Sequence, residues 1–286
     1  ISKASGLENV ITFDMGGTTA KTSMIARGEV TRALDMQVGG GIMHGSRLMT
    51  GAGYALKVPA IDLAEVGAGG GSILSIDTGG SLRAGPESAG ASPGPVCYDA
   101  GGENPTITDA NVILGYINPD HLVGGAVKLN KEKAISVFTR KIAEPLGLSL
   151  EDAAHGAHLI SASNMIRAIK AVSTERGRNP RNYSLFAFGG NGPLFAAGMA
   201  DAIGIKQVIV PPSPGLFSSF GLLYADVEHH YSRTFRRLLT DADPQELTTA
   251  WEGLAKEALD ELNKEGFSGA SAVIERSASL HYKGQI

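Results

Sequence analysis

The sequence predicts an α/β fold with mixed sheets. An apolar strand at 184–188, a helix at 193–202 and a strand at 207–210 follow one another. A strand–helix–strand unit of this kind requires at least one parallel strand pair. Apolar runs joined by glycine turns within 10–25 and 73–83 predict two antiparallel hairpins.

The expected secondary structure changes near residue 130, from short strands and glycine-rich loops to helices. We therefore predict a glycine-rich β-hairpin region at 1–120 and an α/β lobe at 121–286, with flanking helices. Asp109 is a plausible N-cap of a short helix at 109–114. The other expected elements are an irregular loop at 85–102, helices at 131–143, 150–173, 214–224 and 244–264, and strands near 227–238 and 277–286. The 150–173 helix is expected to bury Leu159, Ala162, Ile166, Ile169 and Val172.

Composition excludes several classes of protein. The 286 residues include 25 basic and 29 acidic side chains, a net charge of −4, which argues against nucleic-acid or anionic-membrane partners. No run of about 18 apolar residues exists to span a bilayer. The single cysteine, Cys97, excludes an internal disulfide framework and fits a cytoplasmic location. We expect Cys97 to be a small buried hydrophobe.

Glycine is abundant, at 38 of 286 residues against an average near ~7%. The glycines are clustered, for example at 39–41, 67–71, 79–80 and 189–190. Clustering of this kind indicates backbone that closely approaches something a Cβ would obstruct. Phosphate binding and close packing of strands are the two explanations.

The first glycine cluster with reactive or charged neighbours follows the strand at 10–13. A carboxylate precedes two glycines, two hydroxyls and a lysine: Asp14, Gly16, Gly17, Thr18, Thr19 and Lys21. Successive N–H groups in such a turn can bind phosphate oxygens, and Thr and Lys side chains add donors and charge. Asp14 could hold Mg²⁺ through water, since Mg²⁺ usually takes only one or two carboxylates beside phosphates. The alternative is an ordinary hairpin turn.

The second cluster, at 188–193, lies between a predicted strand and a helix. Its members are Gly189, Gly190, Asn191 and Gly192, followed by Pro193 at the start of the helix. A nucleotide can lie flat on such exposed backbone near a helix N-terminus. Close strand–helix packing is the alternative.

Other sequence patterns give weaker support for a particular function. Phosphate-loop and HExxH motifs are absent, and the G-x-S-x-G match at 90–94 lies in a loop rather than between a strand and a helix. His155 and His158 share a helical face, although solvated helix residues explain them better than a metal site. Arg83, Glu87, Ser88 and Asp109 form polar groups in loops, which either serve turns and caps or contact a substrate or an interface.

Six segments in order, 14–21, 66–73, 85–95, 105–111, 188–193 and 211–215, resemble the hydantoinase A / 5-oxoprolinase family, specifically its second, hydantoinase A domain. The resemblance implies an actin-like ATPase fold built on ribonuclease H-like lobes. It implies that Asp14, Gly16, Gly17, Thr18 and Thr19 form the second phosphate hairpin and that Gly189, Gly190 and Gly192 form the adenosine motif. Lys21, Asn191 and Phe195 depart from the commoner family pattern and leave the substrate open.

The resemblance also implies a reaction. Family members use ATP to open cyclic amides such as hydantoins or 5-oxoproline, and relatives are subunits of ATP-dependent ketone carboxylases. Carbonyl phosphorylation is the mechanism we expect, with Asp14 organising Mg²⁺ and water and Lys21 holding phosphates. A nucleotide-gated reactivation or assembly subunit is the non-catalytic alternative.

The chain begins at Ile1 rather than Met, so we expect a fragment. By resemblance, an N-terminal lobe with the first phosphate hairpin is missing, and a hydantoinase B-type subunit is a partner. The isolated segment is therefore expected to have little ATPase activity.

Overall fold

The computed structural model describes residues 2–33, 36–38, 43–44, 54–56 and 60–284. Gly39 to Gly41 lie outside these ranges. The described chain forms two compact units, residues 1–225 and 226–286. The predicted division at residue 120 stays a prediction.

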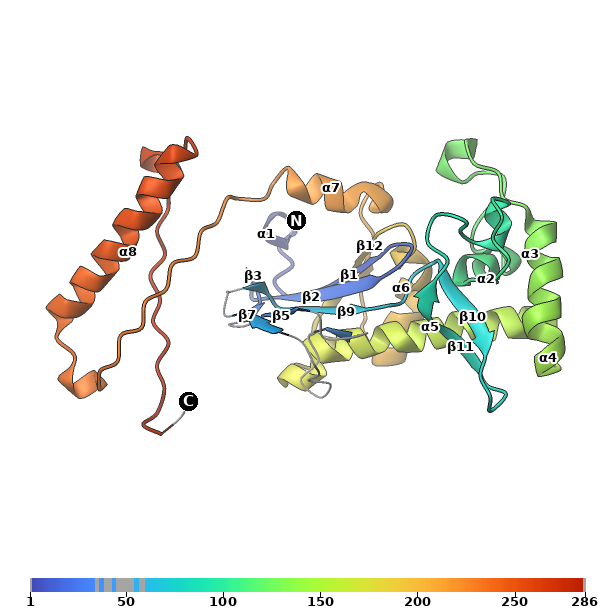
Figure 1. Cartoon of the computed structure of the whole chain (residues 1–286), viewed down its shortest axis with the longest axis horizontal. Helices are drawn as coiled ribbons and strands as arrows, with labels where there is room; N and C mark the ends of the chain where they lie inside the picture. Colours follow the sequence, from blue (N-terminus) through green and yellow to red (C-terminus); the bar gives the residue numbers. More distant parts are fainter. Residues whose placement is uncertain (1, 34–35, 39–42, 45–53, 57–59, 285–286) are drawn as a thin grey trace. The chain divides into compact units, whose positions relative to one another are not determined.

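A seven-stranded mixed sheet organises the first unit (Figure 1). Strands β12 and β13 run parallel to β1, whereas β2, β3, β9 and β6 are added in antiparallel pairs. The strand order is β13 (Val208–Ile209), β12 (Ser184–Phe188), β1 (Val10–Met15), β2 (Ala20–Ala26), β9 (Leu63–Val66) and β6 (Met43–His44), with β3 (Glu29–Val30) also paired to β2. The predicted 10–25 hairpin and βαβ unit are both confirmed.

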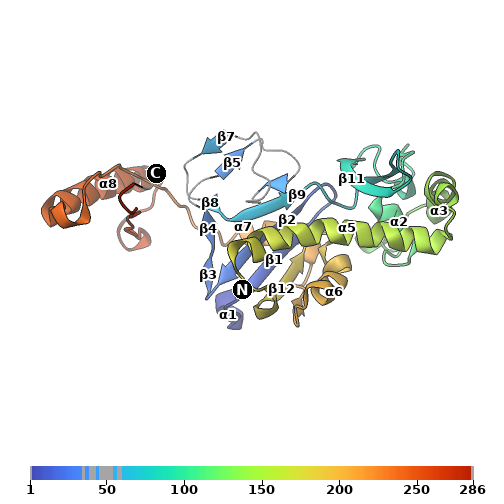
Figure 2. The ribbon, with the colours of Figure 1, turned by 90° about the horizontal axis from the view of Figure 1, so that it is seen from below.

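Alternation along β1 gives the sheet two different faces. Ile11, Phe13 and Met15 are fully buried on one face, whereas Thr12 and Asp14 on the other are partly exposed. Helices α5 (Leu150–Val172) and α6 (Gly192–Ile203) cover the buried face (Figure 2). The sheet thus keeps a polar row at its second face, next to the end of β1.

Helix α5 confirms the expected 150–173 helix and most of its buried stripe, because Ile169 and Val172 are fully buried and Ala162 and Ile166 pack against the core. Ser149 caps its start by accepting the N–H of Asp152 at 3.1 Å. Leu159, expected in the core, is 53% exposed, while small residues such as Ala154, Ala157 and Ala168 are buried. Small side chains let the helix lie close to the sheet, and this preference outweighs the hydrophobicity of Leu159.

The remaining elements of the first unit are short. The predicted 73–83 hairpin is present as β10 (Ser72–Ile76) and β11 (Leu82–Ser88), and β11 therefore enters the expected irregular loop. The others are α1 (Ser2–Ser5), β4 (Arg32–Ala33) with β8 (Ala60–Ile61), β5 (Met36–Val38) with β7 (Tyr54–Leu56), α2 (Ile107–Ile113), α3 (Lys131–Phe138), a π-helical segment (Thr139–Ala143), α4 (Glu144–Leu146) and α7 (Phe217–Leu222).

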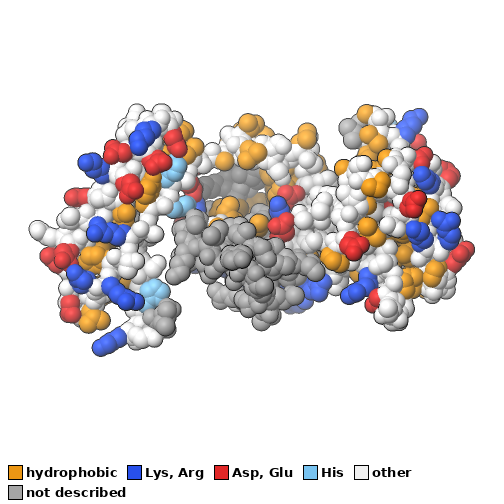
Figure 3. All heavy atoms as spheres, in the orientation of Figure 1, with side chains coloured by type: hydrophobic (Ala, Val, Ile, Leu, Met, Phe, Trp, Pro, Cys, Tyr) orange, Lys and Arg blue, Asp and Glu red, His pale blue; other side chains and the backbone are white. Residues whose placement is uncertain are grey.

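Helix α7 and the residues after it leave large apolar side chains uncovered. Phe217 packs on Phe186 and Phe188, with ring centroids 5.2 and 5.1 Å apart. Leu222, Leu223 and Tyr224 are about three-quarters exposed, and orange side chains accordingly gather over α7 (Figure 3).

The second unit contains the predicted helix, α8 (Pro244–Lys264), capped by Asp243. The strands expected near 227–238 and 277–286 are wrong for the residues described, which adopt no strand there. A strand needs a partner for its N–H and C=O groups, and no described segment of this unit pairs with either stretch.

The N-cap assignment of Asp109 is also wrong. Thr106 is the N-cap of α2, and Asp109 lies three residues later, where its carboxylate accepts the N–H of Thr106 at 2.8 Å. The two residues form a reciprocal capping box.

A buried histidine joins α5 to α2 and α6. The His158 ring stacks on Phe195, with centroids 4.1 Å apart, and its Nδ1 lies 2.9 Å from Asn111 Oδ1. Burial, with a smaller contribution from His155, lowers the pKa of His158 from 6.5 to about 4. The native fold therefore holds this ring neutral at pH 7.

We predict that acid destabilises the protein through His158. Between its unfolded pKa of 6.5 and its folded pKa of about 4, the unfolded state binds more protons, so stability falls as pH falls. The slope is at most about 1.4 kcal/mol per pH unit. Urea unfolding between pH 7 and 5 measures it, and His158→Gln should remove this component. Equal pH slopes for the two proteins would contradict the assignment.

Candidate functional site

Both predicted glycine clusters lie at one edge of the main sheet. Strands β1 and β12 are parallel neighbours, with Asp14 opposite Phe188. The residues that follow, Gly16 and Gly189, therefore leave the same edge together. Asn191 joins the two clusters, because its backbone N–H donates to Met15 O at 2.9 Å.

The turn between β1 and β2 is held by its carbonyl oxygens. Gly16 O accepts from Gly70 N–H and from Asn191 Nδ2, both at 3.1 Å, and Gly17 O accepts from Gly71 N–H at 2.7 Å. Within the described part of the chain, the N–H groups of Gly17, Thr18 and Thr19 have no acceptor. The turn thus uses its acceptors internally and leaves successive donors for a ligand.

The glycines around this turn fall into two kinds. A Cβ on Gly69 would lie 2.5 Å from Gly17 backbone, and one on Gly70 would lie 2.6 Å from Asn191 Nδ2, so packing requires both. Gly16 and Gly17 have open space at the Cβ position and no positive φ. The fold itself does not require glycine at these two positions, which favours a ligand that approaches the backbone.

Asp14 lies between the two clusters. Its Oδ2 accepts the hydroxyl of Ser218 at 3.1 Å, and its Oδ1 lies where a Cβ on Gly189 would collide. Ser218 belongs to α7, so this helix reaches the site as well. No signal in the sequence singled out Ser218, because its contact with Asp14 spans 204 residues.

Lys21 is directly opposite Asp14 on β2, and Glu65 is directly opposite Lys21 on β9. Lys21 Nζ lies 3.7 Å from Glu65 Oε1. Glu65 was not among the predicted site residues. Its place in the polar alternation of a short strand was the available signal, but the pairing of β9 with β2 was needed to bring it beside Lys21.

The second cluster turns sharply before α6. Gly189 has φ +80° and donates its N–H to Pro214 O at 2.9 Å. Gly190 has open space at its Cβ position, and α6 begins at Gly192. The amide nitrogen of Asn191 binds the hairpin, so this side chain braces the turn.

The predicted polar loop residues do not gather into one group. Arg83 is 3.9 Å from Asp77 on its own hairpin and its side chain is two-thirds exposed, and Glu87 is exposed. Ser88 alone approaches the site, because a Cβ on Gly71 would lie 2.9 Å from its Oγ.

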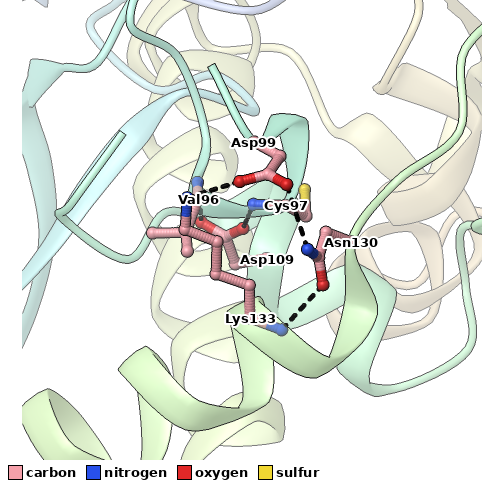
Figure 4. Close-up of polar contacts among 6 residues, drawn as sticks. All are labelled: Val96, Cys97, Asp99, Asp109, Asn130 and Lys133. Atoms are coloured by element: carbon pink, nitrogen blue, oxygen red, sulfur yellow. Dashed lines mark hydrogen bonds and ion pairs between the residues drawn. The ribbon is translucent and has the colours of Figure 1, made fainter. Parts of the chain in front are cut away.

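Asp109 is fully buried and accepts four hydrogen bonds, and Figure 4 shows its carboxylate beside Val96 and Cys97. Oδ1 accepts the N–H of Cys97 at 2.7 Å, while Oδ2 accepts from Val96 N–H at 3.2 Å and from the N–H and hydroxyl of Thr106 at 2.8 Å. These contacts are cap and loop chemistry. The same carboxylate, added to burial as the main cause, raises the pKa of the Cys97 thiol far above its usual value, so Cys97 is a buried neutral side chain.

The described residues hold no group of three or more His, Cys, Asp or Glu side chains placed to share a metal ion. His155 is exposed as expected, but the expectation that His158 is solvated is wrong, because its side chain is buried. Within the described ranges every helix is too short or too polar to span a lipid bilayer.

Gly189→Ala should destabilise the protein by about 2 kcal/mol or more, because the residue has a positive φ and its Cβ would overlap Asp14 and Met15. The control is Gly190→Ala, whose Cβ meets nothing within 4 Å and which we expect to change stability by less than about 0.5 kcal/mol. Chemical denaturation measures both. Equal effects would contradict the packing role.

Asp109→Asn should cost about 2 kcal/mol or more of stability, because its amide cannot accept from all four donors. The free energy of unfolding, measured in urea, reports the loss. A variant of unchanged stability but reduced substrate affinity would instead support substrate contact.

Comparison with known proteins places this geometry in context. The profile of the family described as Hydantoinase/oxoprolinase matches residues 1–231. The alpha subunit of caprolactamase from Pseudomonas jessenii is 36% identical over all of this chain and 40% of its own length. 5-Oxoprolinase 1 of Arabidopsis thaliana is 30% identical over 98% of this chain and 22% of its own.

Two solved structures are similar as well. Nucleotide-free acetone carboxylase superposes with a TM-score of 0.75 at 32% identity, over 93% of this chain and 37% of that one. ATP-dependent caprolactamase gives 0.69 at 34% identity, over 94% and 38%. The likeness confirms the predicted α/β fold of the actin-like ATPase type. The chain spans about two-fifths or less of the length of these relatives.

Proposed function

The chain belongs to the hydantoinase/oxoprolinase family, and from this premise we propose that it is the ATP-binding part of an enzyme that hydrolyses a cyclic amide. Several family relatives are ATP-dependent cyclic amidases or ketone carboxylases. The observation that supports the proposal most is the turn at Gly16–Gly17. The backbone N–H groups of Gly17, Thr18 and Thr19 have no acceptor within the described part of the chain and can therefore donate to a ligand.

Phosphate binding follows from the chemistry of this turn. The N–H groups of Gly17, Thr18 and Thr19 form a short run of donors, and the absence of a Cβ at Gly16 and Gly17 allows close approach of an anion. The hydroxyls of Thr18 and Thr19 and the ammonium of Lys21 would contribute further donors to the phosphates. Gly189, Gly190 and Gly192 would seat the adenosine, and Asn191 would keep the two clusters joined.

Asp14 suits a Mg²⁺ site by its donor chemistry. One of its oxygens is bound by Ser218, and the other has no hydrogen bond within the described ranges. Hard carboxylate oxygens are the ligands Mg²⁺ prefers, usually one or two per site and often through water. Magnesium bound with the nucleotide would neutralise charge on the phosphates. Glu65, paired with Lys21, would hold the lysine in line with Asp14.

The reaction that we propose activates an inert carbonyl. The amide oxygen attacks the γ-phosphorus of ATP, the bond to the bridging oxygen breaks, and ADP leaves. One water then adds to the activated carbon, and the ring C–N bond breaks as the nitrogen takes up a proton, which leaves an acyl phosphate. A second water hydrolyses the acyl phosphate to the carboxylate and inorganic phosphate. The hairpin contributes positioning and charge stabilisation to the first step. Water attack would use residues of the rest of the protein or of a hydantoinase B-type partner.

A ketone carboxylase subunit is the second candidate. The likeness to acetone carboxylase favours it. The same transfer of a phosphoryl group to a carbonyl oxygen would then precede attack by a carbon nucleophile rather than water. Turnover of ATP by the whole protein with its partner, in the presence of lactams or of ketones with bicarbonate, distinguishes the two.

Gly16→Ala in the whole protein should weaken binding of ADP with Mg²⁺ at least tenfold, because a methyl group would stand where a phosphate approaches. The melting temperature should not change, since nothing lies within 4 Å of that position. Titration calorimetry measures the affinity. The matched control is Gly253→Ala on α8, which also has open space. Undiminished affinity in Gly16→Ala would defeat the phosphate-binding proposal.

A further inference from the structure

A second hollow lies at the opposite end of the central strands from the hairpin. It measures about 410 Å³ and is lined by residues that precede β1 and β12 or follow β2. The hairpin closes the carboxyl end of β1, whereas Asn9 at this hollow precedes its amino end. The six residues of β1 separate the two by roughly 20 Å.

The charged side chains that line the hollow are both cationic. They are Arg27 and Arg178, and no carboxylate lines it. Asn9 Oδ1 accepts the N–H of Arg27, and Asn179 Oδ1 accepts the N–H of Arg181, both at 3.1 Å. With their oxygens occupied, these two asparagines are left with Nδ2–H donors.

Arg178 is the clearest sign of a missing partner. Arg178 lies in the segment that joins α5 to β12 and is partly buried, and the acceptor that its guanidinium meets is the thioether of Met24 on β2, at 3.9 Å. Sulfur is a weak acceptor, and a guanidinium carries five donors. Within the described part of the chain no carboxylate pairs with it. A partly buried cation left in this state is costly, and a bound anion removes the cost.

We propose that this hollow is a binding site for a small oxyanion, a molecule that carries a phosphate or a carboxylate group. Such a ligand accepts hydrogen bonds and donates none, which complements a lining of guanidinium and amide donors. Arginine forks match both groups in two-pronged geometry. The volume admits a ligand of several heavy atoms. The site is separate from the nucleotide hairpin and does not depend on it.

The test uses the whole protein saturated with ADP and Mg²⁺, so that inorganic phosphate cannot report on the hairpin. Titration calorimetry with inorganic phosphate and, separately, malonate distinguishes the two sources of the oxyanion. We expect one of them to bind, and Arg178→Met to weaken it at least tenfold. Arg27→Asn should weaken binding as well, because it removes the second guanidinium. Asparagine is the replacement because it tolerates the left-handed backbone at φ +55°.

Arg181→Met is the matched control, because Arg181 packs beside Gly204 and does not line the hollow. If Arg178→Met does not fold, the Arg27→Asn variant still tests the proposal, because Arg27 is exposed in a turn. Absence of binding by both probes overturns the proposal, as does binding that neither arginine variant weakens. Failure of ADP to bind would count against the nucleotide site alone, since both arginine variants act at the other end of the sheet.

Discussion

Three hydrogen bonds hold the Gly16–Gly17 turn against its neighbours, and the candidate site depends on them. Gly70, Gly71 and the Asn191 amide take the carbonyl oxygens of the turn. Once those acceptors are occupied, the N–H groups on the other side of the same peptides remain without partners in the described structure. The close contact is possible only because Gly69 and Gly70 carry no side chain. Packing on one side of the loop thereby creates donor capacity on the other.

The parallel pairing of β1 and β12 extends this arrangement into a site. Their register places Asp14 opposite Phe188, next to Gly189, although Asp14 and Phe188 are 174 positions apart in the sequence. Antiparallel pairing on the other side then adds Lys21 and Glu65 to the row that Asp14 begins. A single edge of one sheet collects backbone donors, a cation and two carboxylates, the groups that phosphoryl transfer uses for positioning and charge balance.

The two anion sites that we propose, at opposite ends of the same strands, would use different chemistry. At the carboxyl end the donors are backbone amides of a glycine turn, fixed in place by the sheet. At the amino end they are the side chains of Arg27 and Arg178 with neighbouring asparagines. Amide donors are rigid and uncharged, whereas guanidinium groups bring net charge, so the two sites differ in how strongly salt should screen them.

The sequence by itself determined the fold class, the two hairpins, helix α8 and the residues that make up the two glycine clusters. These features rest on local alternation, turn residues and short-range spacing. Tertiary structure alone decided which glycines are required by packing, since Gly69 and Gly16 look alike until their neighbours are known. It also moved Asp109 from a candidate substrate contact to a saturated buried cap, and brought Glu65 and Ser218 to the site. Contacts of this kind join residues far apart in the chain, and they follow from strand pairing and close packing, which leave no local pattern.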